Sequence, residues 1–229
     1  MVFSGIEKSS LVDFGDKLTC TVFTHGCNYR CPFCHNSQLV TASSSVNIDE
    51  DEVLSFLKKR KALLDAVCVS GGEPTLHQEI YGFLEKVKVL GYQTKLDTNG
   101  TNPEFLSKLI NDGLVDYVAM DIKTSFENYP KITDTKNPNT EKVKQSLDFL
   151  INSKTDFELR TTLVAEYHSE EDFIKISKAV AGTKRYYLQK YVDRGTCITG
   201  GLTEVDKQTA EKYKGILSQT VKNVYLRGY

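Results

Sequence analysis

Residues 66–100, AVCVSGGEPTLHQEIYGFLEKVKVLGYQTKLDTNG, contain two strand-like runs separated by a segment with helical periodicity. The runs at 66–70 and 92–97 are rich in Val, Leu, Tyr and Thr, as strands are. Between them, apolar residues recur at helical spacing up to the stop signal Gly91, and Thr75-x-x-Gln78 predicts the start of the helix. The stretch therefore predicts a strand–helix–strand unit with parallel strands.

The same alternation extends in both directions from this unit. Further strand-like runs lie at residues 18–24, 115–122, 157–164 and 185–190, and the terminal VKNVYLRGY predicts a last strand. Start or stop signals mark helices at Asp49-x-x-Glu52, Asn102–Pro103 to Gly113, Thr140 and Ser169, and a sixth helix is expected at about 204–218. Six such units predict an α/β fold with a parallel sheet, and both a partial (β/α)6 barrel and a doubly wound sheet fit the pattern.

Composition excludes several classes of protein. With 229 residues, 40% hydrophobic and 26% charged, the chain has ordinary globular composition, and we expect residues 1–229 to form a single domain. A net charge of −1 supplies no broad attraction for nucleic acid. No segment approaches the roughly 20 apolar residues of a membrane span, and the N-terminus has no targeting pattern. We therefore expect a cytoplasmic protein without nucleic-acid or membrane partners. Residues 41–45, TASSS, are expected to form a short polar connector.

Three of the six cysteines are clustered, in the order Cys27-Asn-Tyr-Arg-Cys31-Pro-Phe-Cys34. In a reducing cytoplasm, such a cluster indicates metal ligation rather than disulfides. Cys20 and Cys68 lie in strand-like runs and are expected to be buried thiols, whereas Cys197 lies in a Gly- and Thr-rich loop. These three have no cluster-forming spacing, so we expect no auxiliary metal cluster.

Chemical groups collect just after the predicted strands. The cysteines follow the first strand, SGGEP the second and DTNG the third, and MDIK ends the fourth. Because ligands bind at the carboxyl ends of parallel strands, these groups are expected to line one site. Two long polar connections, residues 123–139 and 192–203, lie at the same end of the sheet and are typical of functional loops.

Three close thiolates suit either zinc or an iron–sulfur cluster. A structural zinc site needs a fourth ligand, for which His25 and His35 are candidates, but His35 is adjacent to Cys34 and neither histidine has a usual finger spacing. A four-iron cluster held by three cysteines leaves one iron open to a small molecule, which indicates catalysis. A zinc-binding interaction module remains the alternative from another class.

The motif Cys27-x3-Cys31-x2-Cys34, with Phe33 before the last cysteine, resembles the signature of the radical S-adenosylmethionine (SAM) enzymes, and GGEP resembles their second motif. Residues 10–125 are similar to anaerobic ribonucleotide reductase activating proteins, which are close to pyruvate formate-lyase activating enzymes. The resemblance implies a partial (β/α)6 barrel of the radical SAM type. It also implies that Cys27, Cys31 and Cys34 hold a [4Fe–4S] cluster whose open iron binds SAM.

The resemblance also implies roles for other residues. It implies that Gly71, Gly72 and Glu73 bind the methionyl amino group of SAM, that Asp121 and Lys123 approach its ribose and carboxylate, and that Phe33 packs near its adenine. It places a monovalent cation at Asp97, Thr98 and Asp121. Arg160 and Gln189 are expected to make further cofactor contacts. Taken alone, Lys123 is typical of a solvated surface charge. A valine at Gly72 is expected to block SAM sterically and to leave the cluster intact.

The activity implied by the resemblance is radical generation. One electron cleaves SAM to methionine and a 5′-deoxyadenosyl radical, which removes hydrogen from a glycine of a glycyl radical enzyme. Anaerobic ribonucleotide reductase is the expected partner, and flavodoxin or ferredoxin the expected electron donor. The alternative is a radical SAM enzyme that acts on a small molecule or modifies a peptide.

Overall fold

The computed structural model describes residues 1–41 and 46–229, so most of the connector expected at 41–45 lies outside the described residues. Its centre is an eight-stranded sheet in the order β10-β9-β8-β7-β6-β5-β3-β2. The strands are β2 (Gly5–Ser10), β3 (Thr19–Thr24), β5 (Ala66–Gly71), β6 (Gln93–Thr98), β7 (Tyr117–Asp121), β8 (Asp156–Leu163), β9 (Arg185–Lys190) and β10 (Asn223–Arg227). A separate pair joins β1 (Val2–Phe3) and β4 (Ile48–Asp49).

The sheet contains the predicted parallel strands and an additional edge strand. From β3 to β10 every neighbouring pair is parallel, which confirms the six predicted strands and the last one at the C-terminus. The unpredicted strand, β2, pairs antiparallel with β3. Its sequence, GIEKSS, is mostly polar because it forms an edge of the sheet, so it carries no strand signal.

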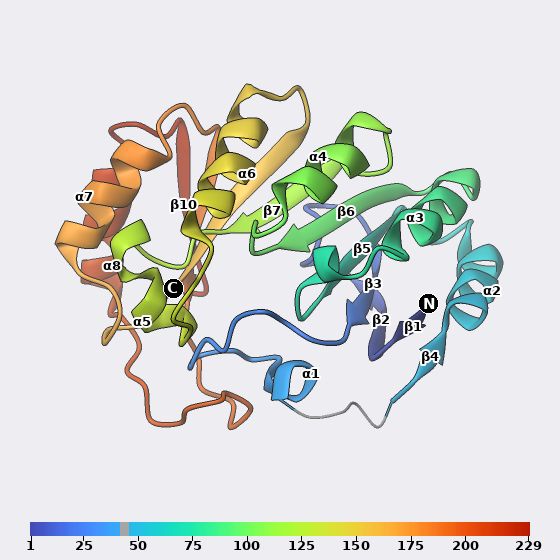
Figure 1. Cartoon of the computed structure of the whole chain (residues 1–229), viewed down its shortest axis with the longest axis horizontal. Coiled ribbons are helices and arrows are strands. Elements are labelled where there is room, and N and C mark those ends of the chain that lie inside the picture. The colour runs from blue at the N-terminus through green and yellow to red at the C-terminus, as the bar shows by residue number, and fades with distance from the viewer. Residues whose placement is uncertain (42–45) are drawn as a thin grey trace.

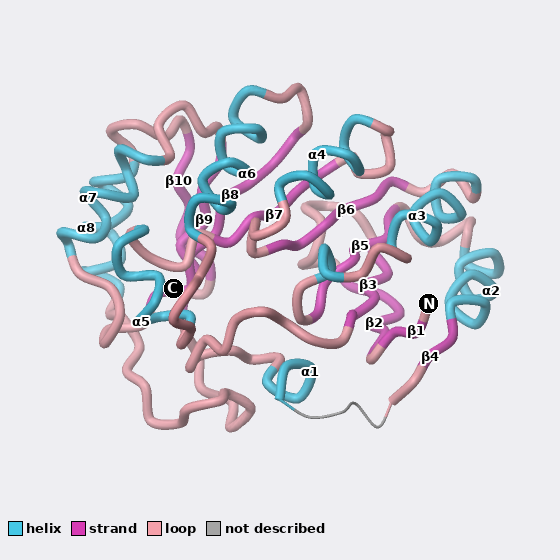
Figure 2. The backbone as a smooth tube through the Cα atoms, viewed as in Figure 1, coloured by secondary structure: helices cyan, strands magenta, loops and turns pink. Residues whose placement is uncertain are grey.

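Helices cover the outer face of the curved sheet (Figures 1 and 2). The longer ones are α2 (Glu50–Arg60), α3 (Ile80–Val89), α4 (Pro103–Asn111), α6 (Thr140–Asn152), α7 (Glu170–Ala179) and α8 (Lys207–Leu217). Short helical segments are α1 (Ser37–Thr41), η1 (Pro74–Leu76), η2 (Phe126–Asn128) and α5 (Tyr129–Thr133). A doubly wound sheet carries helices on both faces, so this arrangement is a partial barrel. Among the helices of the described residues, none is long and apolar enough to cross a membrane.

Two of the predicted helix caps are confirmed, a third is at the predicted position but makes no side-chain hydrogen bond, and a fourth is wrong. The Asn102 side chain accepts a hydrogen bond from the backbone of α4, and Ser169 forms a capping box at α7. Asp49 precedes α2 without a side-chain cap, and the helix predicted to start at Thr75 begins at Ile80. The Thr75 hydroxyl instead donates to the neighbouring Glu73 carboxylate, which removes it from capping.

The carboxyl ends of the parallel strands meet at the open side of the barrel. There the loop after β3, which carries the cysteines, lies beside the loop at 192–203 that follows β9 (Figure 1). The long connection at 123–139 also reaches this side, and it contains η2 and α5 rather than an entirely irregular loop. The fold therefore brings both long connections to the cysteines.

Candidate functional site

A cavity of about 260 Å³ lies at the carboxyl ends of the strands. It is lined by residues from six segments: Cys27, Tyr29, Cys31, Phe33, Cys34, His35, Asn36, Val40, Ser70, Gly71, Gly72, Asp97, Thr98, Asn99, Asp121, Lys123, Arg160, Thr162 and Gln189. Every predicted site residue is in this lining except Glu73. The convergence predicted from the strand ends is therefore present in the structure.

The cysteine loop is held in place by both long connections. The amide of Arg30 donates to the Thr133 carbonyl at 2.9 Å, and the Tyr29 hydroxyl donates to the Pro138 carbonyl at 2.6 Å. From the other side, the Thr199 amide donates to the Pro32 carbonyl at 2.9 Å. These hydrogen bonds hold the backbone of the cysteine loop on two sides, so the three thiols lie on a segment braced by both long connections.

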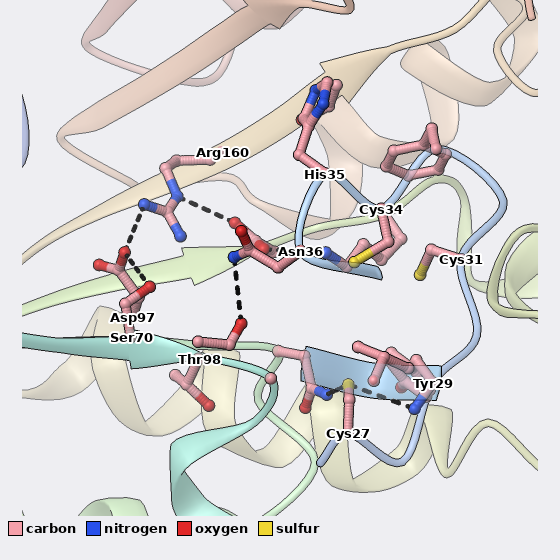
Figure 3. Close-up of a pocket in the computed structure, with 18 of the residues that line it drawn as sticks. Cys27, Tyr29, Cys31, Cys34, His35, Asn36, Ser70, Asp97, Thr98 and Arg160 are labelled. Carbon is pink, nitrogen blue, oxygen red and sulfur yellow. Dashed lines mark hydrogen bonds and ion pairs between the residues drawn. The ribbon is translucent and has the colours of Figure 1, made fainter. Parts of the chain in front are cut away.

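The three thiols of the loop are free and point toward the cavity (Figure 3). The Cys27 sulfur accepts from the Tyr29 amide at 3.4 Å and from Asn99 Nδ2 at 3.9 Å. Burial raises the pKa of Cys27 to about 11 and the pKa of Cys31 to about 12. These thiols are therefore protonated at neutral pH until a metal displaces their protons.

A structural zinc ion would need a fourth ligand beside the three cysteines. Within residues 1–41 and 46–229, no three or more His, Cys, Asp or Glu side chains are gathered as a site for a single ion. The His35 ring stacks on Tyr191, and its Nδ1 lies 3.7 Å from the Cys197 sulfur. Thiols spread around a cavity suit a multi-iron cluster better, because each thiolate there binds a different iron.

The glycine pair of GGEP packs against the base of the cysteine loop. The Gly72 amide donates to the Thr24 carbonyl at 3.1 Å, and the Glu73 amide donates to the Gly26 carbonyl at 2.8 Å. Gly71 has φ +118°, and a Cβ at Gly72 would overlap the carbonyl group of Gly26. In contrast to the expectation from sequence, we therefore predict that a valine at Gly72 also disturbs the cluster, because the side chain would displace the loop that carries Cys27.

Substituting Gly72 with alanine should consequently lower both the thermal stability of the chain and its capacity for iron. Overpacking against backbone costs about 1–3 kcal/mol, and here the adjoining cysteine loop must move. Melting temperature and iron content after reconstitution measure the two effects. Gly82→Ala is the matched control, since a Cβ there meets nothing within 4 Å, and native-like values for both variants would refute the packing argument.

Glu73 lies beneath the cavity, not in its wall. Its side chain is fully buried, and Oε1 accepts from the Thr75 amide at 3.1 Å, the Thr75 hydroxyl at 2.6 Å and the Thr98 hydroxyl at 2.7 Å. Oε2 accepts from the Asn99 amide at 2.6 Å. Burial raises the pKa of Glu73, and these hydrogen bonds oppose that rise. The carboxylate thus joins the loops after β5 and β6, and its predicted contact with an ammonium group gains no support from this placement.

A chain of ion pairs joins β6, β7 and β8, and Figure 3 shows its link between Arg160 and Asp97. Arg160 donates to Asp97 at 3.2 Å and to Asp121 at 2.9 Å. Lys95 pairs with the other oxygen of Asp97 at 2.7 Å, and Lys123 with the other oxygen of Asp121 at 2.8 Å. Although burial alone raises the pKa of Asp97, Arg160 and Lys95 hold it below its usual range. The Lys123 side chain is 17% exposed, so the surface-charge interpretation is wrong.

Sequence comparison agrees with this geometry. The sequence profile of the radical SAM superfamily matches residues 21–180, which include the cysteine loop, the glycine loop and the ion pairs. The chain belongs to the radical SAM superfamily. It is therefore an enzyme of the radical SAM class, and membership implies a [4Fe–4S] cluster and SAM as its cofactors.

This radical SAM enzyme has relatives over most of its length. It is 33% identical to a protein of Methanocaldococcus jannaschii named as a glycyl-radical enzyme activating enzyme, across 82% of this chain and 79% of the relative. It is also 33% identical to a pyruvate formate-lyase-activating enzyme of Listeria monocytogenes, across 58% of this chain and 57% of the relative. The structure of Streptococcus suis SuiB with precursor peptide SuiA shares the fold, with a TM-score of 0.70 at 14% identity over 91% of this chain and 48% of SuiB.

The residues of this radical SAM enzyme fit the cluster that the superfamily implies. Cys27, Cys31 and Cys34 are free thiols, and in the described part of the chain they are the only cysteines that line the cavity. Bound there, the cluster would supply the electron that cleaves SAM. The assignment of individual side chains to SAM stays a prediction, with Phe33 5% exposed and Gln189 at the end of β9 on the cavity wall.

Several lining residues of this radical SAM enzyme were not predicted as site residues. Thr162 lies two residues after Arg160 on β8, so strand alternation would have placed both on one face. Asn36 donates to the Gly71 carbonyl at 3.3 Å and joins the cysteine and glycine loops. Tyr29 and Asn99 were within quoted motifs, but only the folded chain shows that both approach the Cys27 sulfur.

Proposed function

We propose that this radical SAM enzyme activates a glycyl radical enzyme by removing a hydrogen atom from a glycine of that protein. The names of the relatives at 33% identity support this activity. The observation that carries the proposal is a cavity in which three free thiols from one braced loop face the strand-end motifs, at the open side of a partial barrel.

The proposed reaction balances with one external electron. Held by Cys27, Cys31 and Cys34, the cluster would pass one electron from a low-potential donor to the sulfonium of SAM, whose S–C5′ bond would break to give methionine and a 5′-deoxyadenosyl radical. That radical takes one hydrogen atom from the α-carbon of glycine, which yields 5′-deoxyadenosine and a glycyl radical. We propose flavodoxin or ferredoxin as the donor, because each transfers single electrons.

The open side of the barrel suits a protein substrate. The cysteine loop and the loops at 123–139 and 192–203 border it, and they bond to one another through Arg30, Tyr29 and Thr199. A glycine loop of a partner has no side chain to obstruct approach to the cavity. Hydrogen transfer needs the reacting atoms held within roughly 3–3.5 Å, which loops around a peptide can achieve.

Within the cavity, the enzyme's own residues would hold SAM away from bulk water. Gly71 and Gly72 line the cavity without a side chain, which lets the methionyl end approach, and the cations Lys123 and Arg160 favour its carboxylate. Phe33 supplies an apolar surface for adenine. Asp121 and Gln189 offer acceptors and donors for the remaining polar groups.

We propose anaerobic ribonucleotide reductase in the cytoplasm as the partner. The test mixes the reconstituted enzyme, SAM, reductant and candidate glycyl radical enzymes without oxygen, and records electron paramagnetic resonance spectra. A glycine-centred signal that disappears when the target glycine becomes alanine supports the proposal. If the candidates stay silent while a small metabolite or a short peptide accelerates 5′-deoxyadenosine release, the enzyme acts on that molecule instead.

A further inference from the structure

The monovalent cation expected at Asp97, Thr98 and Asp121 does not fit this cavity. The guanidinium of Arg160 lies between the two aspartates, with Nη1 3.2 Å from Asp97 Oδ2 and Nε 2.9 Å from Asp121 Oδ1. A metal ion shared by the two carboxylates would need the space that this side chain fills. Figure 3 shows the dashed line from Arg160 to Asp97.

All four carboxylate oxygens of the two aspartates already have cationic partners. Besides the two bonds to Arg160, Asp97 Oδ1 accepts from Lys95 at 2.7 Å and Asp121 Oδ2 accepts from Lys123 at 2.8 Å. Ser70 donates a further hydrogen bond to Asp97 Oδ2 at 3.1 Å. Each of the four oxygens therefore already has a cation beside it, so the two carboxylates are compensated without a metal ion.

The third expected ligand, Thr98, is also engaged. Its hydroxyl donates to Glu73 Oε1 at 2.7 Å and accepts from the Gly100 amide at 3.1 Å. The threonine is 3% exposed, so these bonds replace water. The hydroxyl therefore serves the turn after β6 rather than a cation in the cavity.

Charge balance opposes a metal ion as well. Lys95, Arg160 and Lys123 carry three positive charges against the two negative charges of Asp97 and Asp121, an excess of one. Glu158, two residues before Arg160 on the same strand, accepts from Tyr117, faces Arg227 at 4.0 Å and also acts electrostatically on Arg160. A metal ion added between the aspartates would be repelled by these three cationic side chains in a partly buried site, where repulsion is stronger than in water.

We propose that the Arg160 guanidinium is a built-in cation that replaces the monovalent metal ion in this enzyme. From β8, its side chain links the carboxylates of Asp97 on β6 and Asp121 on β7. Together with Lys123 it also places positive charge beside the cofactor cavity, where an anionic group of SAM can pair with it. SAM binding and cleavage by this enzyme are then independent of sodium and potassium. The proposal concerns the cofactor cavity and holds for any radical acceptor.

The first test compares monovalent salts. The reconstituted holoenzyme, without a protein partner, is assayed for reductive release of 5′-deoxyadenosine in potassium, sodium or choline chloride at one ionic strength. Rates within about twofold of one another are expected, since matched ionic strength equalises screening. Stimulation by potassium or sodium of about tenfold or more over choline would overturn the proposal.

Crystals of the holoenzyme grown with rubidium chloride give a readout that does not depend on activity. No anomalous peak is expected between Asp97 and Asp121, where Arg160 lies. A rubidium peak bound to both carboxylates would overturn the proposal even if the rates were insensitive to salt.

Removing the guanidinium should create a metal-ion site. Arg160→Ala leaves one oxygen of each aspartate without its cation, so potassium or sodium should raise the melting temperature and the rate of 5′-deoxyadenosine release relative to choline. The matched control is Arg185→Ala on the neighbouring strand, which loses an outer pair with Asp156 and a contact with the Tyr117 ring and should show no selectivity. If neither readout of Arg160→Ala responds to the metal ions, the proposal is wrong.

Discussion

Replacing Cys31 with alanine is expected to abolish the iron–sulfur absorbance of the reconstituted enzyme and to reduce 5′-deoxyadenosine release to background. Cys31 is 6% exposed and lines the cavity with Cys27 and Cys34. Loss of one thiolate leaves two ligands where the cluster needs three to keep a single open iron. Iron content, visible absorbance and product release measured in the same preparation check the expectation.

Cys68→Ala is the matched control for this substitution. Cys68 is also buried, but it lies within β5 and outside the cavity lining, so the variant should retain its cluster. Cys20→Ala and Cys197→Ala should retain it too, although the Cys197 sulfur lies 3.7 Å from the Phe33 carbonyl. Full iron loading in Cys31→Ala would contradict the ligand assignment.

Glu73→Ala should destabilise the chain by about 3 kcal/mol or more. The substitution leaves the buried amides of Thr75 and Asn99 and the hydroxyl of Thr98 without their acceptor, and each unsatisfied donor costs about 1–3 kcal/mol. For a chain of this size the melting temperature should fall by roughly 6–12 °C. Thermal unfolding of the reduced apoprotein measures the change.

Glu85→Ala provides the comparison, because Glu85 is exposed on α3 and its loss should change stability by about 0.5 kcal/mol or less. A Glu73→Ala variant as stable as Glu85→Ala, with unchanged SAM affinity, would refute the bracing role. A variant of native stability that no longer binds SAM would instead favour the predicted ammonium contact.

The alternation of strands and helices could be predicted from sequence because each element carries its own signal. Val-rich runs such as 66–70 need no partner to be recognised, and Asn102 and Ser169 cap their helices through bonds within a few residues. The same local logic failed at Thr75, since a buried carboxylate two residues earlier takes its hydroxyl. The polar edge strand β2 was missed because its pairing depends on β3 rather than on its own residues.

Which residues line the site could be predicted from the sequence more completely than how those residues contact one another. The rule that strand ends share one edge predicts that the cysteines, Gly71, Asp97 and Lys123 line one site, as they do in the structure. No sequence pattern indicates that Gly72 packs against Gly26, or that Arg160 lies between two aspartates 63 and 39 residues away. Such contacts depend on how strands far apart in sequence are registered, and no local pattern encodes that.

Isotope transfer tests the proposed activity most directly. A candidate partner enzyme is prepared with glycine deuterated at the α-carbon and incubated anaerobically with the reconstituted enzyme, SAM and reductant, and the 5′-deoxyadenosine is analysed by mass spectrometry. Because the proposed step moves the α-hydrogen of glycine to the deoxyadenosyl carbon, the product should carry deuterium when its formation depends on the partner. Unlabelled 5′-deoxyadenosine, formed together with a glycyl radical or without one, would contradict direct hydrogen abstraction from glycine.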